Sequence, residues 1–301
     1  MNSGYQSGGY TIEKPPEQQM NNHPLDNMEG QPVQITENQL MTTQAQPVYV
    51  PAGGFVFVQD PLMELMNVRT AIVKQKFELL EAVTGCETPN RYYVYVKDEQ
   101  GNKKYLFKAK ENSSCLCRYF CPGSCRGFEL DLRRVVDYSK GGNKVNFARF
   151  KRPFKCTCYC CNRPELVGNF IGEKSGYIGK ISEPCTVCDP KLYLSNSSNV
   201  IAYTITCNCC QCGYCLRDTC CGKCSEVDFN IFKGSTDNGQ PVGNIHKEYK
   251  GCRTFVGDKD DFKITFPIEA TPEEKVLIIG AVIMMDFLYY EDKSKDESSQ
   301  A

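Results

Sequence analysis

Histidine is scarce in this sequence, and neither sign of charge is in excess. His23 and His246 are the only two His among 301 residues, which leaves little material for a His-centred catalytic triad or a His-rich catalytic metal site. The 35 Lys and Arg against 36 Asp and Glu give a formal net charge of -1, so the strongly basic composition of a general nucleic-acid binder is missing. The sequence also contains no phosphate loop and no dinucleotide-binding fingerprint. We therefore expect no covalent catalysis and no specific nucleic-acid partner.

A secretory signal is also missing from the start of the sequence. Residues 1–30 carry no apolar segment behind a basic one, so we expect a protein of the cytosolic side, where thiols stay reduced. Residues 1–58 are rich in Gln, Asn, Pro and Gly and show no hydrophobic periodicity, which predicts a disordered tail. Residues 292–301 form a second, short polar tail, which leaves 59–291 as the folded domain.

Short segments rich in Tyr, Val, Ile and Phe recur between residues 91 and 266, separated by polar turns. Regularly spaced segments of this kind predict a mainly β protein, either a closed barrel or a sandwich. The segments are YYVYV (92–96), KYLFKA (104–109), FELDLR (128–133), VNFARF (145–150), KLYL (191–194), VIAYTIT (200–206), VDFNIF (227–232) and FKITF (262–266). Ahead of them, the apolar residues between 60 and 80 recur mostly at spacings of three, four and seven, which predicts an amphipathic, interrupted stretch.

The clearest single element is a C-terminal helix. Thr271, Pro272 and Glu274 supply a helix N-cap, a Pro at the first helical position and the Glu of a capping box. The apolar run that follows, residues 276–290, contains Asp286 and is shorter than the roughly 20 residues that span a bilayer. A helix that is apolar on all sides also suits the centre of a β-barrel, and we favour that burial over a membrane span.

Cysteine is abundant, with 20 residues, most of them in clusters. Reduced thiols in clusters serve as metal ligands, as lipid attachment sites or as small buried side chains. Three CxxC pairs have the spacing that lets two thiolates reach one zinc ion, although the gap between the last two pairs is shorter than in zinc ribbons. The candidates for zinc binding or further acylation are Cys185, Cys188, Cys207, Cys209, Cys210, Cys212, Cys215, Cys220, Cys221 and Cys224.

The segment KRPFKCTCYCC (151–161) places four thiols among basic and aromatic side chains. Such a composition suits a membrane surface, where clustered Cys are targets of reversible palmitoylation. Two acyl chains anchor a protein firmly where one is marginal, because each buried CH2 contributes about 0.8 kcal/mol. We therefore predict covalent palmitate on Cys156, Cys158, Cys160 and Cys161.

The chain resembles the phospholipid scramblase family over residues 60–291. Order and spacing agree along the whole series of resembling segments. These include CLCRYFCPGSCRGFELDLR (115–133), the KRPFKCTCYCC cluster, EPCTVC (183–188), CGKCSEVDFNIF (221–232) and IIGAVIMMDFLYYE (278–291). The resemblance implies a tubby-like fold, in which a closed β-barrel of about twelve strands surrounds the hydrophobic helix 272–290.

The same resemblance implies a function. It points to calcium-responsive, ATP-independent, bidirectional movement of phospholipids between membrane leaflets. The protein would be anchored through palmitoylated Cys to the cytosolic face of the plasma membrane or an endomembrane. The resemblance also implies four oxygen ligands for calcium: Asp258, Asp260, Asp261 and Glu269.

The residues themselves fit an EF-hand calcium loop poorly. Phe262 and Lys263 stand where such a loop has a ligand and a Gly, and FKITF alternates like a strand. The alternative interpretation of this segment is an acidic turn that enters a strand.

Two functions stay open on the sequence. Lipid transport needs a path for a polar headgroup through about 30 Å of hydrocarbon. One short helix with Asp286 inside it does not supply that path alone, so this function requires homo-oligomers or local distortion of the bilayer. The alternative is a palmitate-tethered, non-transporting signalling module, stabilised or not by zinc, that binds lipid or protein.

Overall fold

The computed structural model describes residues 60–76, 89–114, 125–135, 144–156, 161–172, 174–215, 226–248 and 258–290. The two tails predicted at 1–58 and 292–301 lie outside these residues, as does most of the first Cys cluster. The tail predictions therefore stay predictions.

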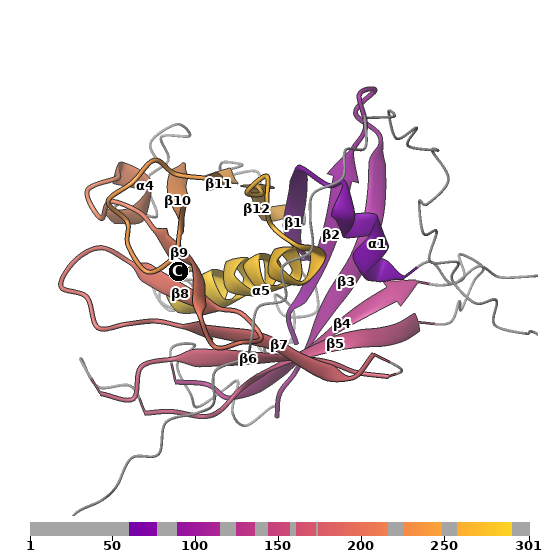
Figure 1. Ribbon diagram of the computed structural model, residues 1–301, viewed down its shortest axis with the longest axis horizontal. Coiled ribbons are helices and arrows are strands. Elements are labelled where there is room, and N and C mark those ends of the chain that lie inside the picture. Colours follow the sequence, from indigo (N-terminus) through magenta and orange to yellow (C-terminus); the bar gives the residue numbers. More distant parts are fainter. Residues whose placement is uncertain are drawn as a thin grey trace, which may run out of the picture. The chain divides into compact units, whose positions relative to one another are not determined.

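The described residues form one closed barrel of twelve antiparallel strands (Figure 1). Each strand pairs with its neighbour in sequence, and the last pairs with the first through the register Ala71↔Ile264. The strands are β1 (Thr70–Lys76), β2 (Arg91–Lys97), β3 (Lys103–Asn112), β4 (Phe128–Val135), β5 (Lys144–Arg152), β6 (Glu165–Phe170), β7 (Gly176–Ser182), β8 (Lys191–Ser195), β9 (Ile201–Thr206), β10 (Val227–Lys233), β11 (Gly243–Glu248) and β12 (Asp258–Thr265). The predicted mainly β, closed barrel around a C-terminal helix is confirmed.

The amphipathic stretch predicted between residues 60 and 80 is described over residues 60–76, where it consists of two elements of different kinds; residues 77–80 lie outside the described residues. A short helix, α1 (Pro61–Met66), begins at Asp60, whose carboxylate accepts a hydrogen bond from the backbone N–H of Leu62. The chain then becomes strand β1, in which Ala71 and Val73 are buried and the alternate side chains face outward. The apolar spacing of three and four therefore describes α1 alone, because β1 follows the period of two of a strand.

The C-terminal helix α5 (Pro272–Tyr289) passes through the barrel (Figure 1). Its capping box forms as predicted, with the Glu274 N–H donating to the Thr271 hydroxyl and the Thr271 N–H donating to the Glu274 carboxylate. Every residue from Lys275 to Phe287 is buried. The part of the chain that the structure describes contains no helix with both the length and the apolar character needed to cross a bilayer. The apolar surface of α5 is instead covered by the inner faces of the strands.

Two polar side chains of α5 are accommodated inside this apolar core. Asp286 accepts a hydrogen bond of 2.7 Å from the hydroxyl of Tyr92 on β2, and both residues are buried. The ammonium of Lys275 donates to the backbone carbonyls of Leu65, Met66 and Val68, at 3.0, 2.9 and 2.9 Å. These carbonyls end α1, so Lys275 caps the C-terminus of that helix and fixes α1 against α5.

A buried polar cluster holds the other end of α5. The hydroxyl of Tyr289 donates to the carboxylate of Glu183 at 2.8 Å, and Arg163 forms an ion pair with the same carboxylate. Burial raises the pKa of Glu183, and the Tyr289, Arg163 and Arg152 side chains offset that rise only in part. The cluster therefore holds a carboxylate that is costly to ionise.

We expect Glu183 to make stability depend on pH. When the folded-state pKa of a group lies above its unfolded-state pKa, the native state binds more protons at pH values between these two pKa values. The contribution of Glu183 to the free energy of unfolding is therefore fully present at low pH and is lost as the pH rises through the folded-state pKa. Glu183→Gln should therefore melt above the wild type at about pH 7, and the difference should shrink towards about pH 5. Thermal unfolding of the wild type and the variant between about pH 5 and about pH 7 measures this difference in melting temperature. A difference that widens on acidification would contradict the expected direction.

Candidate functional site

Three of the four residues predicted to bind calcium, Asp258, Asp260 and Asp261, lie on strand β12, and Glu269 follows its end. Asp258 pairs in register with Lys76 of β1, and Asp261 pairs with Lys74 of β1 and Glu248 of β11. The segment therefore adopts the strand conformation of the alternative interpretation. The side chains of Asp258 and of Asp260 lie outside the described part of the structure.

The other two predicted ligands have separate surroundings. The Asp261 side chain is buried and accepts a hydrogen bond of 3.5 Å from Tyr95, whose pKa is raised by burial and by this carboxylate. Glu269 is exposed and forms an ion pair of 2.6 Å with Lys233. Among the described side chains, no group of three or more His, Cys, Asp or Glu is placed to hold a metal ion. Calcium binding by the four residues stays a prediction.

The predicted thiols are distributed over several loops. In the palmitoylation segment Cys156 and Cys161 are exposed, and Cys158 and Cys160 lie outside the described residues. Exposure is what an acyltransferase requires, so the two visible thiols meet the first condition for acylation. Neither acylation nor zinc binding is decided by their positions.

The remaining Cys candidates differ in accessibility. Cys185, Cys188 and Cys210 are exposed, and Cys207 is buried. A hydrogen bond with Asp189, together with burial and Cys210, raises the pKa of Cys209 to about 12, which disfavours the thiolate form that binds metals. The side chains at positions 212, 215, 220, 221 and 224 lie outside the described part; positions 212 and 215 bound the short helix α4 (Cys212–Cys215).

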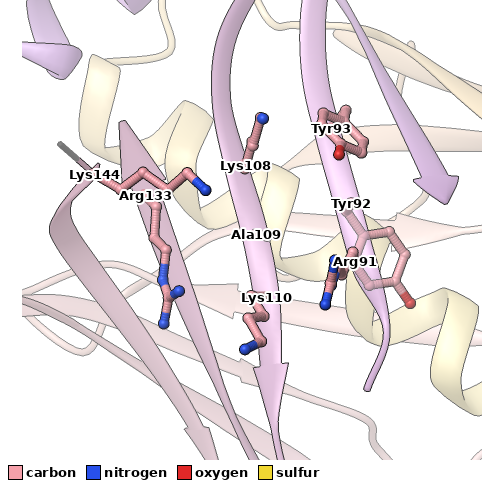
Figure 2. Close-up of a pocket in the computed structure, with 8 residues that line it drawn as sticks. All are labelled: Arg91, Tyr92, Tyr93, Lys108, Ala109, Lys110, Arg133 and Lys144. Carbon is pink, nitrogen blue, oxygen red and sulfur yellow. The ribbon is translucent and has the colours of Figure 1, made fainter. Parts of the chain in front are cut away.

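A cationic hollow on the outer wall of the barrel was not anticipated from the sequence. Figure 2 shows Lys108 and Lys110 projecting from β3, between Arg91 of β2 on one side and Arg133 of β4 with Lys144 of β5 on the other. The hollow has a volume of about 190 Å³. Its lining is completed by Tyr92, Tyr93 and Ala109, so five of its eight residues are cationic and none is acidic. We call these eight residues the cationic hollow.

The strand period of two creates this surface. Ala109 points into the core, and its neighbours Lys108 and Lys110 therefore share the outer face. Lys108 is half-buried, and burial together with the ammonium groups of Lys144 and Lys76 lowers its pKa. The hollow thus gathers positive charges close enough to disfavour one another.

A carboxylate on β4, beside the hollow, already has its own donors. Asp131 accepts hydrogen bonds from Arg149 at 2.7 Å, Arg133 at 3.1 Å and Asn112 at 2.7 Å. Burial opposes ionisation of Asp131, but these donors hold its pKa below the usual range. Asp131 lies opposite Lys110 in the β3–β4 register, and its carboxylate is engaged by Arg149, Arg133 and Asn112 at the edge of the hollow.

Sequence reasoning missed the hollow for a physical reason. The alternation in KYLFKAKEN predicts that Lys108 and Lys110 share a face, and that much was available. The register that brings Arg91, Arg133 and Lys144 beside them comes from pairing between strands. A formal net charge of -1 conceals such a patch, because it sums the charges of the whole chain and carries no information on where they lie.

These features define a class of protein: a helix-filled, closed β-barrel with a cationic outer hollow and exposed thiols in its loops. A profile of the Scramblase family matches residues 55–292 of the chain. The chain therefore belongs to the Scramblase family.

Individual relatives agree with this assignment. Phospholipid scramblase 1 of Homo sapiens is 31% identical over 234 residues, which cover 77% of this chain and 66% of the human protein, just under two thirds of its length. Phospholipid scramblase 1 of Rattus norvegicus is 30% identical over 84% of this chain and 73% of its own. Phospholipid scramblase 2 of Bos taurus is 28% identical over 87% of this chain and 79% of its own.

Proposed function

We propose that this protein moves phospholipids between the leaflets of a membrane, without ATP, without covalent catalysis and in both directions. The observation that supports this most directly is the family match, because it spans the whole barrel and α5. Its relatives are named phospholipid scramblases. The cationic hollow adds a surface suited to phosphate-bearing headgroups.

The route of the lipid follows from the filled barrel. Ile278, Val282 and Met285 of α5 are all 0% exposed, so in the described part of the barrel this helix occupies the interior that a headgroup would have to enter. The headgroup therefore travels along the outside of the protein. A homo-oligomer or a local thinning of the bilayer supplies the path through about 30 Å of hydrocarbon.

Attachment to the cytosolic membrane face is assigned to palmitate on Cys156, Cys158, Cys160 and Cys161. The exposure of Cys156 and Cys161 supports this. Two or more acyl chains anchor a protein stably, whereas one gives marginal binding. The cluster therefore has thiols to spare for a durable anchor.

Calcium is proposed as the trigger, bound weakly by oxygen ligands at Asp258, Asp260, Asp261 and Glu269. The extended backbone of β12 would spread Asp258, Asp260 and Asp261 along a strand instead of gathering them in a loop, and Glu269 follows the end of that strand. Binding of calcium would have to rearrange the start of β12, where the register with β1 already shifts between Lys74 and Lys76.

Reconstitution in liposomes tests the proposal. A fluorescent lipid is placed in both leaflets, and a membrane-impermeant quencher is added with and without calcium. We expect the protein to expose inner-leaflet lipid in the presence of calcium, and the pair Asp258→Ala with Asp260→Ala to abolish that dependence. The matched control removes two exposed acids elsewhere, Glu99→Ala with Glu273→Ala, and should leave it unchanged.

Protection of the inner leaflet under every condition, with clean dye-leakage controls, would contradict lipid movement. It would favour instead the palmitate-tethered binding module.

A further inference from the structure

Like charges face one another across the outer wall of strands β1 to β4. In the first row Lys76 of β1 pairs with Arg91 of β2, and Arg91 pairs with Lys110 of β3. Acidic residues stand at the two ends of this row, with Asp258 of β12 opposite Lys76 and Asp131 of β4 opposite Lys110. In the next row Lys108 of β3 pairs with Arg133 of β4. Like charges directly opposite each other on antiparallel strands are destabilising. Two such pairs in the first row and one in the next gather cations around Lys108 and Lys110 on this wall.

The neighbours of these cations make the second row suitable for a ligand. The ammonium of Lys108 lies 4.9 Å from the centre of the Tyr93 ring, and Lys144 points towards the same space from β5 (Figure 2). Half-burial of Lys108 means that a bound anion would be screened less than on an open surface. A bound anion would also relieve the repulsion that lowers the pKa of Lys108.

The size and spacing of the site narrow the class of anion. A volume of about 190 Å³ is below the roughly 300 to 1,000 Å³ of pockets for drug-sized ligands, so the site takes a compact group. Residues two apart on a strand are separated by roughly 7 Å. The cross-strand row that contains Lys108 and the one that contains Lys110 are therefore far enough apart for each to contact a different phosphate group. Two phosphate groups on one small ligand can each occupy one row.

We propose that the cationic hollow is a binding site for a compact ligand that carries at least two phosphate groups, either as a lipid headgroup or free in solution. Lys108 and Arg133 hold one phosphate, and Arg91 with Lys110 holds the other. This assignment concerns where phosphate binds and does not require that the protein move lipid.

The test uses the full chain and two double variants that remove the same charge. Lys108→Gln with Lys110→Gln empties the centre of the hollow. The matched control, Lys97→Gln with Lys103→Gln, removes another like-charge pair from the same two strands, roughly 20 Å away at their other end. Binding is measured to inorganic pyrophosphate in solution and to phosphatidylcholine vesicles carrying either phosphatidylinositol bisphosphate or phosphatidylserine at matched total charge.

We expect the hollow variant to lose about tenfold or more in affinity, because each charge-assisted hydrogen bond contributes about 1.5 to 3 kcal/mol. The control should change by less than about twofold. The hollow variant should also melt no lower than the wild type, since it relieves repulsion, which separates lost binding from lost folding.

The measurements with pyrophosphate and with vesicles distinguish a soluble phosphate ligand from a lipid headgroup. Binding to pyrophosphate alone assigns a soluble ligand, and binding to the bisphosphate vesicles assigns a lipid headgroup. Equal losses in the two double variants, or equal binding to the phosphatidylserine vesicles, would overturn the site, as would no binding in any arm. Calcium-dependent lipid exchange is scored separately in vesicles without bisphosphate, so failure of transport leaves this result intact.

Discussion

Gly280→Val is expected to destabilise the protein by about 3 kcal/mol or more, because it forces a side chain into the contact between α5 and β5. A Cβ at Gly280 would lie 2.9 Å from two ring carbons of Phe150 and 3.2 Å from Ile181. The same ring also packs closely against the backbone of Gly168, where an added Cβ would lie 2.5 Å from it, so both glycines are needed to accommodate Phe150. Urea unfolding measures the loss.

Two further variants make this prediction specific. Gly239→Val, at an exposed glycine with nothing within 4 Å of an added Cβ, should be nearly neutral. Combining Gly280→Ala with Phe150→Leu should cost less than the sum of the two single changes, since a smaller partner makes room for the methyl group. A stable Gly280→Val protein would mean that α5 does not pack against Phe150.

Lys275→Met should be the second most damaging change, with a loss of about 3 kcal/mol. The variant keeps the length of the buried chain but removes the donor for the carbonyls of Leu65, Met66 and Val68. The Leu65 carbonyl keeps the N–H of Val68 as a donor at 3.1 Å, so the loss falls on the partly buried carbonyls of Met66 and Val68, at about 1 to 3 kcal/mol each and partly relieved by local rearrangement. Chemical denaturation gives the total loss.

Hydrogen exchange localises the effect of Lys275→Met. We expect faster exchange in α1 and at the start of β1, with β8 to β10 unchanged. Lys263→Met, at an exposed lysine of β12, is the control and should alter neither measurement. Uniform acceleration across the barrel would contradict a local capping role.

The parts of the fold predicted from sequence are those determined by local chemistry. The capping box at Thr271 fixes the start of α5, and alternating Tyr, Val, Ile and Phe marks eight of the strands. Asp286 stands out in the sequence because it is an acidic residue within the apolar run 276–290. Its partner Tyr92 lies almost two hundred positions earlier in the chain, so the pair became visible only in the structure.

Two of the strands that the sequence did not predict, β6 and β7, have a shared cause. β6 and β7 contain Gly168 and Gly179, which weaken a strand pattern because they supply no side chain to it. Both glycines are there for close approach: the ring of Phe150 meets Gly168, and an added Cβ at Gly179 would lie 2.3 Å from the Ser195 carbonyl and 3.1 Å from Leu277 of α5. The contacts that explain these residues exist only once the barrel has closed around the helix.

The candidate sites also differ in whether local sequence or strand pairing determines them. Exposed thiols and acidic residues can be picked out by type and spacing, although their ligands stay predictions. The cationic hollow depends on the register of four strands, since Lys108 meets Arg133 only through the β3–β4 pairing. Local sequence shows alternation, but not which alternating residues become neighbours.

The central claim is that α5 stays inside the barrel while the protein works at a membrane, so that lipid passes along the outside. Photoreactive phospholipids provide the most direct measurement: the protein is bound to vesicles, irradiated, digested and mapped by mass spectrometry. We predict that crosslinks fall on exposed segments and that residues 276–287 carry none. Crosslinks along α5 would contradict the account, because they would place that helix in the bilayer.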